Sequence, residues 1–154
     1  MKQQRAPTLA ALALIAGLGF SPAHAVDNMN STDAPDLTSV RAKIKAMDYA
    51  GALAQLRKLA DDVQHADVYN LLGFTLRNLG DYKQSLTYYQ KALDFDPNHK
   101  GAHEYLGELY VKLGDKTGAD REVQILQKLC PSGCEELADL RTFMATETAD
   151  LKTN

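Results

Sequence analysis

The chain has 154 residues, of which 45% are hydrophobic and 24% charged, and its formal net charge is −3. Loss of the first 25 residues would remove Lys2 and Arg5 and leave 15 basic against 20 acidic residues, a net charge of −5. An acidic surplus is the wrong sign for nucleic acid or an anionic membrane surface, so neither is expected as a partner.

The N-terminus is predicted to be a secretory signal peptide. Lys2 and Arg5 precede an apolar run at residues 8–20, and residues 23–25 (Ala-His-Ala) match the A-x-A cleavage pattern. The run is too short and wrongly flanked for a transmembrane helix, although an N-terminal anchor helix is the alternative. The sequence therefore predicts cleavage after Ala25 and a soluble mature protein in the periplasm, without membrane insertion.

The rest of the chain is predicted to be all-helical, because apolar residues recur every three or four positions and never alternate over the length of a strand. Residues 26–34 are polar and aperiodic, which indicates a flexible lead-in. Pro35 and Asp36 suit a first helical turn, and Asp48 ends that helix. Its expected apolar face consists of Leu37, Val40, Ile44 and Met47.

Six more helices follow, separated by glycines, prolines and short polar breaks. The second is expected to run to a turn at residues 64–66, and the seventh to span residues 135 to about 148. The expected ends of the third to sixth helices are, in order, Gly80, the residue before Pro97, Gly114 and Pro131.

The third to sixth helices come from a unit that occurs twice at a spacing of 34 residues. Shifting residues 66–97 by 34 places Leu79-Gly80-Asp81 on Leu113-Gly114-Asp115, and Pro97 on Pro131. A fixed period of this length predicts stacked copies of one small unit rather than one globular core.

This unit resembles the tetratricopeptide repeat, which has an aromatic and Leu-Gly on its first helix and a small residue, an aromatic and alanine on its second. The resemblance implies an all-α solenoid of about three helix-turn-helix repeats plus a C-terminal capping helix. The expected segments are a degenerate repeat at 35–65, repeats at 66–99 and 100–133, and the capping helix and tail at 134–154. The middle copy carries the pattern as Tyr69, Leu72-Gly73, Leu76, Ser85, Tyr89, Ala92 and Pro97, and the last copy as His103, Leu106-Gly107, Tyr110, Ala119, Val123, Leu126 and Pro131.

Two glycines on the first helices are expected to bring the helices of a pair close together. They are Gly73 and Gly107, whereas Arg41 stands at the corresponding place in the first copy. A loose terminal copy is typical of the end of a solenoid.

In this family the first helix of each repeat lines the concave side of the solenoid, so the resemblance implies a peptide-binding face there. Asn70 offers a donor and an acceptor, and Arg77 can fork onto a carboxylate. Phe74 and Tyr105 offer flat apolar surface, or alternatively pack against the next repeat. The full expected set is Asn70, Leu71, Phe74, Arg77, Asn78, Glu104, Tyr105 and Glu108.

The clamp that some family members use for a C-terminal carboxylate is not expected here. Phe74 and Glu108 occupy positions where that clamp needs asparagine or a basic residue. Glu104 and Glu108 would also repel a carboxylate.

The only two cysteines, Cys130 and Cys134, bracket Pro-Ser-Gly between the sixth and seventh helices. In an oxidising compartment such a pair is expected to form a disulfide that fixes the docking angle of the last helix. The alternative is thiol-redox chemistry or thiolate-metal binding, since Cys134 opens a helix. The stretch LCPSGCEEL, following GAHEYLGELY, also resembles a group of short secreted tetratricopeptide proteins of Gram-negative bacteria.

Catalysis is not expected, because no nucleophile motif, P-loop or dinucleotide-binding glycine motif is present and no cofactor is implied. His99 and His103 have a metal-ligand spacing, but His99 falls in a turn and His103 takes an aromatic position, so no metal site is expected. The sequence therefore predicts a periplasmic adaptor that binds a protein or peptide partner. The alternatives are a redox or metal-handling protein acting through Cys130 and Cys134, and self-association through Tyr82 and Tyr88.

Overall fold

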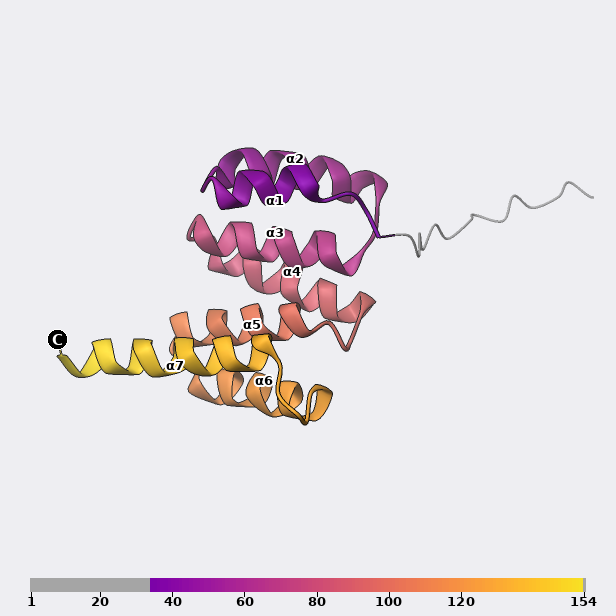
Figure 1. Ribbon diagram of the computed structural model, residues 1–154. Helices are drawn as coiled ribbons and strands as arrows, with labels where there is room; N and C mark the ends of the chain where they lie inside the picture. The colour runs from indigo at the N-terminus through magenta and orange to yellow at the C-terminus, as the bar shows by residue number, and fades with distance from the viewer. Residues whose placement is uncertain (1–33, 154) are drawn as a thin grey trace, which may run out of the picture.

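The computed structural model describes the backbone of residues 34–153 and the side chains up to residue 147, so the predicted signal peptide and the cleavage site lie outside the described residues. The described chain is all-helical, as predicted, and none of its helices is long and apolar enough to span a bilayer. Figure 1 shows the helices stacked in successive pairs, with the last helix beside the final pair. The helices are α1 (Thr38–Lys45), α2 (Tyr49–Asp62), α3 (Ala66–Asn78), α4 (Tyr82–Phe95), α5 (Lys100–Lys112), α6 (Lys116–Leu129) and α7 (Glu135–Thr153).

The second helix of each pair begins at an aspartate that caps it. The side chains of Asp48, Asp81 and Asp115 each accept a hydrogen bond from the backbone N–H three residues further on, at 2.9 to 3.0 Å. These bonds satisfy a donor that would otherwise have no partner at the helix N-terminus. The same residue type therefore starts α2, α4 and α6.

The turn between the two helices of a pair has the same backbone form in all three copies. Gly80 and Gly114 have positive φ angles of 81° and 75°, and Met47 takes that position in the first copy with φ 58°. In the first copy the Asp48 N–H bonds to the Lys43 carbonyl, which is the Schellman pattern of a helix C-terminus. The expected placement of Met47 on an apolar helix face is therefore wrong: its side chain is 75% exposed.

Close approach within the middle pair depends on Gly73. A Cβ there would lie 2.5 Å from the ring of Tyr89, and the Ser85 hydroxyl donates to the Gly73 carbonyl at 2.7 Å. Tyr89 is fully buried between α3 and α4. The expected role of this glycine is confirmed.

The corresponding glycine of the last copy has a different neighbour. A Cβ on Gly107 would meet Leu140 of α7 at 2.6 Å, rather than a residue of its partner helix α6. Within the third pair, Gly118 of α6 allows the two helices to approach closely, since a Cβ there would lie 2.7 Å from Tyr110. The expectation for Gly107 is corrected: it admits the last helix.

The buried core of the described chain consists of three clusters, and one of them lies between the third pair and the last helix. Leu126 of α6 packs with Leu137 and Leu140 of α7 in a buried cluster. Thus α7 covers the apolar face left by the third pair, as expected of a capping helix. Figure 1 shows it lying alongside α5 and α6.

Candidate functional site

Four helices surround a cavity of about 330 Å³ on the side formed by the first helices of the pairs. Four of the predicted concave residues line it: Asn70 and Leu71 from α3, and Glu104 and Tyr105 from α5. Their side chains are brought together because α3 and α5 are the same element of two successive repeats. This hollow, the concave cavity, is the candidate site.

The first turns of α7 form a wall of the concave cavity that the sequence analysis did not predict. Glu135, Glu136 and Asp139 line it, and Arg41 of α1 lies among the lining residues on another side. A helix assigned only to capping contributes here because its first turns reach past α5 toward α3. The paired acids at its start were visible in the sequence, but their position depends on how α7 docks.

A second hollow of about 520 Å³ adjoins the concave cavity at the N-terminal ends of α3 and α5. The two share Asp67, His99, Gly101 and Glu136 among their lining residues. Together they make a longer groove, which continues to the loops before each of these helices.

Two histidines cap the helices along this groove. His65 Nδ1 accepts from the Asp67 N–H at 3.2 Å, and His99 Nδ1 accepts from the Ala102 N–H at 3.0 Å. His99 Nε2 then donates to Asp67 Oδ1 at 2.9 Å, which lowers the pKa of the Asp67 carboxyl. Sequence reasoning missed these caps, although His65 and His99 are 34 residues apart.

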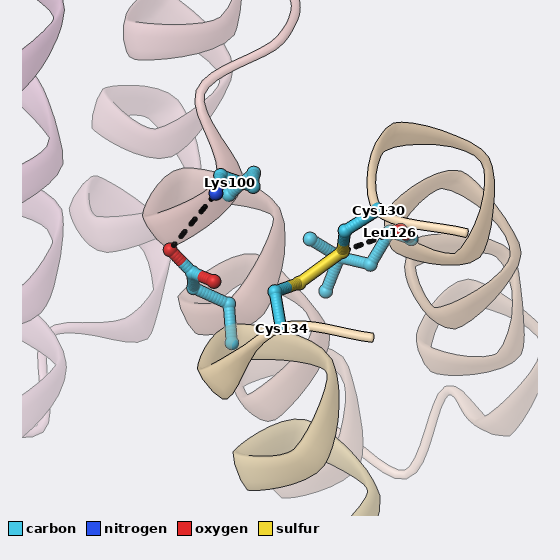
Figure 2. Close-up of a disulfide and its surroundings, with 5 residues drawn as sticks. Lys100, Leu126, Cys130 and Cys134 are labelled. Carbon is cyan, nitrogen blue, oxygen red and sulfur yellow. Dashed lines mark hydrogen bonds and ion pairs between the residues drawn. A yellow bond between two sulfur atoms is a disulfide. The ribbon is translucent and has the colours of Figure 1, made fainter. Parts of the chain in front are cut away.

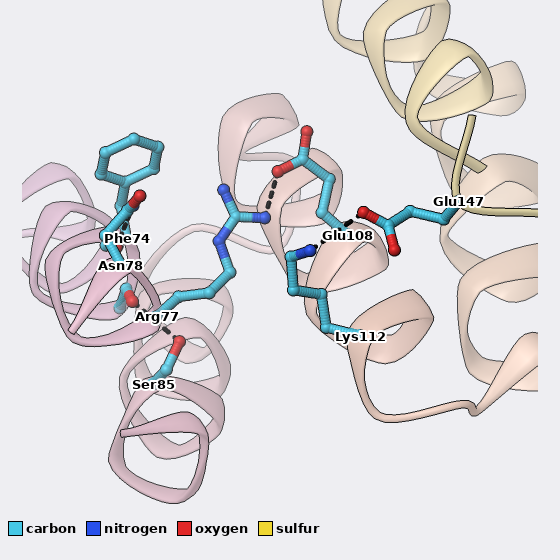
Figure 3. Close-up of polar contacts among 8 residues, drawn as sticks. Phe74, Arg77, Asn78, Ser85, Glu108, Lys112 and Glu147 are labelled. Carbon is cyan, nitrogen blue, oxygen red and sulfur yellow. Dashed lines mark hydrogen bonds and ion pairs between the residues drawn. The ribbon is translucent and has the colours of Figure 1, made fainter. Parts of the chain in front are cut away.

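Next to the cavity, Arg77, Phe74, Tyr105 and Glu108 form a tight cluster between α3 and α5. Arg77 Nη1 donates to Glu108 Oε2, with side-chain exposures of 10% and 11% (Figure 3). The Phe74 and Tyr105 rings meet at 4.9 Å, and the Arg77 guanidinium lies 5.4 and 5.5 Å from their centroids.

This cluster changes two of the expectations. Arg77 was expected to hold a carboxylate of the partner, but its carboxylate is Glu108 of the same chain. Phe74 and Tyr105 pack between repeats, which is the alternative considered for them. Asn78 is exposed and donates to the Phe74 carbonyl at 2.8 Å, and it does not line the cavity.

Glu104 has an unusual environment at the concave cavity. It is 8% exposed, and in the described part of the chain its carboxyl has no hydrogen bond or ion pair. Burial raises the pKa of Glu104 to about 8. Three acidic neighbours add to the shift and the Arg77 guanidinium opposes it; the acids are Glu108, Asp139 and Glu136.

His103 lies apart from this cavity and joins α5 to α6. Its ring nitrogens meet Glu122 Oε2 at 2.7 Å and the Pro97 carbonyl at 3.0 Å. Burial alone lowers the pKa of His103, but these two hydrogen bonds outweigh burial and raise it. With a carboxylate and a carbonyl as acceptors, the ring donates from both nitrogens only as the imidazolium. Among the described residues, no group of three or more His, Cys, Asp or Glu side chains could hold a metal ion.

Cys130 and Cys134 lie between α6 and α7, where their sulfur atoms are bonded (Figure 2). Both side chains pack against the cluster of Leu126, Leu137 and Leu140. Two residues beyond Cys134, Glu136 lies 3.9 Å from Lys100 of α5. This junction therefore sets where the first turn of α7 lies at the concave cavity.

Comparison with known sequences identifies the repeat unit. Residues 66–99 match the sequence model of the tetratricopeptide repeat. An uncharacterized protein, ycf37 of Guillardia theta, is 36% identical over 73 residues, which make up 47% of this chain. The chain spans only 41% of the length of that relative.

Comparison with solved structures shows the same fold over most of the chain. A crystal structure of PcrH in complex with the chaperone binding region of PopD superposes with a TM-score of 0.62 at 21% identity, covering 73% of this chain and 87% of that one. The type III secretion translocator chaperone SycD of Yersinia enterocolitica gives a TM-score of 0.62 at 16% identity, covering 78% and 95%.

Proposed function

We propose that this chain, which carries a tetratricopeptide repeat in an all-helical solenoid, is a non-catalytic adaptor of the periplasm that binds a partner on its concave face. The partner is an extended or helical segment of another protein. The observation that carries the proposal is the concave cavity, which joins side chains of α1, α3, α5 and α7.

The structural neighbours support a peptide as the ligand class. PcrH was crystallised with the chaperone binding region of PopD, so a solenoid of this fold does hold a segment of another protein. At 21% identity this likeness carries the fold, and the ligand of the present chain must be argued from its own residues.

The location of the protein is a separate part of the proposal. It is supported by the N-terminal pattern of Lys2, Arg5 and residues 23–25, and by the bonded pair Cys130 and Cys134, since disulfides persist in oxidising compartments. We expect the protein in the osmotic-shock fraction, with a mature N-terminus at Val26 measured by intact mass. An uncleaved chain that stays in the membrane fraction would refute this part.

Site-specific photo-crosslinking in living cells tests the binding face. A benzoyl-phenylalanine at Asp139 or Arg41, both exposed and lining the cavity, is compared with one at Gln90 or Arg121, which are exposed on α4 and α6 and line neither hollow. One protein, identified by mass spectrometry, should be captured from the first pair of positions and not from the second.

The captured protein is then purified and titrated against wild type and Asn70→Ala. A weaker affinity of the variant at unchanged thermal stability supports the concave face. Equal capture from α4 and α6, or equal affinity of the variant, contradicts it. Capture of a second copy of this chain from the α4 and α6 positions would instead favour the alternative, self-association through Tyr82 and Tyr88.

A further inference from the structure

Two polar side chains that line the concave cavity, Asn70 and Glu104, have acceptor atoms without a donor among the described residues. Glu104 is 8% exposed and has no hydrogen bond or ion pair there. Asn70 is 6% exposed, and its Oδ1 is buried without a partner. Buried polar atoms of folded proteins are nearly always hydrogen-bonded, so the buried Asn70 Oδ1, with the unpaired Glu104 carboxyl lining the same cavity, indicates a missing donor.

The charges around the cavity are strongly one-sided. Five carboxylates line it, and Arg41 is the lone guanidinium among the described lining residues. The five are Asp67, Glu104, Glu135, Glu136 and Asp139. Two of them are already paired, Asp67 with His99 at 2.9 Å and Glu136 with Lys100 at 3.9 Å. Glu104 therefore faces a net negative field without a cation of its own.

The walls of the cavity fit a long side chain that ends in a polar group. Leu71 and Tyr105 provide apolar surface in the cavity that Glu104 also lines. Gly101 keeps the neighbouring wall open, because a Cβ there would lie 3.4 Å from Asn70 Nδ2 and 3.5 Å from His99 Cε1. An aliphatic stem can thus lie along the apolar wall while its head reaches the acceptors.

We propose that the concave cavity binds a basic side chain, a lysine ammonium or an arginine guanidinium, carried by the partner segment. An ammonium has three donors and no acceptor, which complements the Asn70 Oδ1 and the Glu104 carboxylate. A carboxylate ligand would face five lining carboxylates against the single Arg41 guanidinium, and the described residues include no group able to hold a metal ion. The inference rests on the proposed peptide-binding function and names the residue type that this function selects.

The electrostatics of Glu104 agree with this geometry. Its pKa of about 8 keeps much of the carboxyl protonated near neutral pH while no cation is bound. The charged groups that face it are Glu108 on α5, Glu136 and Asp139 on α7, and Arg77 on α3. A bound cation favours the ionised form, so binding should release a proton.

The test is an NMR titration of the ¹⁵N-labelled protein at pH 7.5 with N-acetyl-lysine methylamide. Its matched control is N-acetyl-norleucine methylamide, which has the same stem without the charge. We expect saturable shifts of the amides of Asn70, Gly101, Glu104 and Asp139 with the lysine probe, and none with norleucine. Equal shifts with both probes, or no shifts with either, overturn the proposal.

Three variants test whether the probe binds at this specific site or is attracted by the overall negative charge of the protein. Glu104→Gln should weaken the affinity for the lysine probe at least fivefold. Gly101→Ala should also weaken this affinity, because the added methyl group occupies space at the cavity wall without disturbing the helix. Asp120→Asn removes one negative charge from α6, which does not line the cavity, and should leave binding unchanged. Equal loss in Asp120→Asn and Glu104→Gln refutes a specific site.

n-Butylammonium tests whether the cavity recognises a lysine within a peptide or any small amine. It should bind more weakly than the lysine probe, because it lacks the peptide backbone; equal or tighter binding shows a free-amine site and overturns the peptide part. The two proposals fail separately. If a partner is crosslinked but the lysine probe does not bind, the adaptor function is supported and the basic-side-chain site is refuted. If the lysine probe binds but no partner is captured at the concave face, the site is supported and the adaptor function is refuted.

Discussion

Arg77 of α3 and Glu108 of α5 form an ion pair that connects two successive repeats, and both side chains are about nine-tenths buried. The Arg77 guanidinium also opposes the raised pKa of Glu104, which lines the cavity. The pair, drawn in Figure 3, therefore joins the two repeats, and its guanidinium partly offsets the negative charge around Glu104.

Arg77→Met should destabilise the protein by about 2 kcal/mol at pH 8, because it leaves Glu108 buried without its partner. The double variant Arg77→Met/Glu108→Met should be more stable than the sum of the two single changes. Urea unfolding of the four proteins measures this coupling as a double-mutant cycle. Additive single effects would show that the pair contributes no coupling energy.

The raised pKa of Glu104 makes the stability of the protein depend on pH. Between the unfolded value of 4.5 and the folded value of about 8, the folded state holds a proton that the unfolded state releases. The contribution of Glu104 is therefore fully present below pH 4.5 and is lost as pH rises through 8. At about 1.4 kcal/mol per pKa unit, this loss is on the order of 2 to 4 kcal/mol after solvent relaxation.

Glu104→Gln should be as stable as wild type at pH 5 and more stable at pH 8.5, measured by urea unfolding at both values. His103 has a raised pKa too, so its contribution falls with rising pH in both proteins and cancels in the comparison. Asp120→Asn is the control for loss of one negative charge. A constant difference between wild type and Glu104→Gln across this range would contradict the shift.

Met47→Gly should stabilise the protein by about 1 kcal/mol, since Met47 has the positive φ that Gly80 and Gly114 have in the other copies. Met47→Ala is the matched control, because it removes the exposed side chain but keeps the Cβ that causes the strain. Thermal unfolding should place glycine above both methionine and alanine. Equal melting temperatures for the two variants would mean that the backbone carries no such strain.

Gly73→Ala should cost about 2 kcal/mol by overpacking, because the new Cβ would lie 2.5 Å from the buried ring of Tyr89. Gly101→Ala is the control at a position with room for a methyl group. The new Cβ would lie 3.4 Å from its nearest neighbour, so this change should not lower the free energy of unfolding. Urea midpoints at a constant m-value measure both. Similar midpoints would show that α3 and α4 can separate without penalty.

Cys134→Ser should lower the stability of the oxidised protein by about 2 kcal/mol, the chain-entropy value for so short a loop. The disulfide lies at the junction that positions the first turn of α7 at the concave cavity. Its loss should therefore also shift the amide signals of Glu135, Glu136 and Asp139. Reduced wild type should match the variant in both measurements. A variant as stable as oxidised wild type would show that the bond does not constrain this junction.

The helices, their order and the repeat could all be predicted from the amino-acid sequence. Aspartates at 48, 81 and 115, glycines at 80 and 114, and the 34-residue spacing act on neighbouring backbone through caps and allowed φ angles. Local rules of this kind do not depend on the rest of the fold. The resemblance to the tetratricopeptide repeat, rather than these local rules, placed Asn70, Leu71, Glu104 and Tyr105 on one side of the solenoid.

The neighbours of those side chains depend on how the helices pack and could not be predicted from the sequence. Arg77 meets Glu108 rather than a ligand, Gly107 admits Leu140 of α7, and the acids of α7 line the same cavity as Asn70 and Glu104. The docking angle of α7 and the distance between α3 and α5 arise from packing among residues far apart in the chain. Because ionisation follows burial and neighbouring charge, the unusual state of Glu104 exists only once those helices have come together.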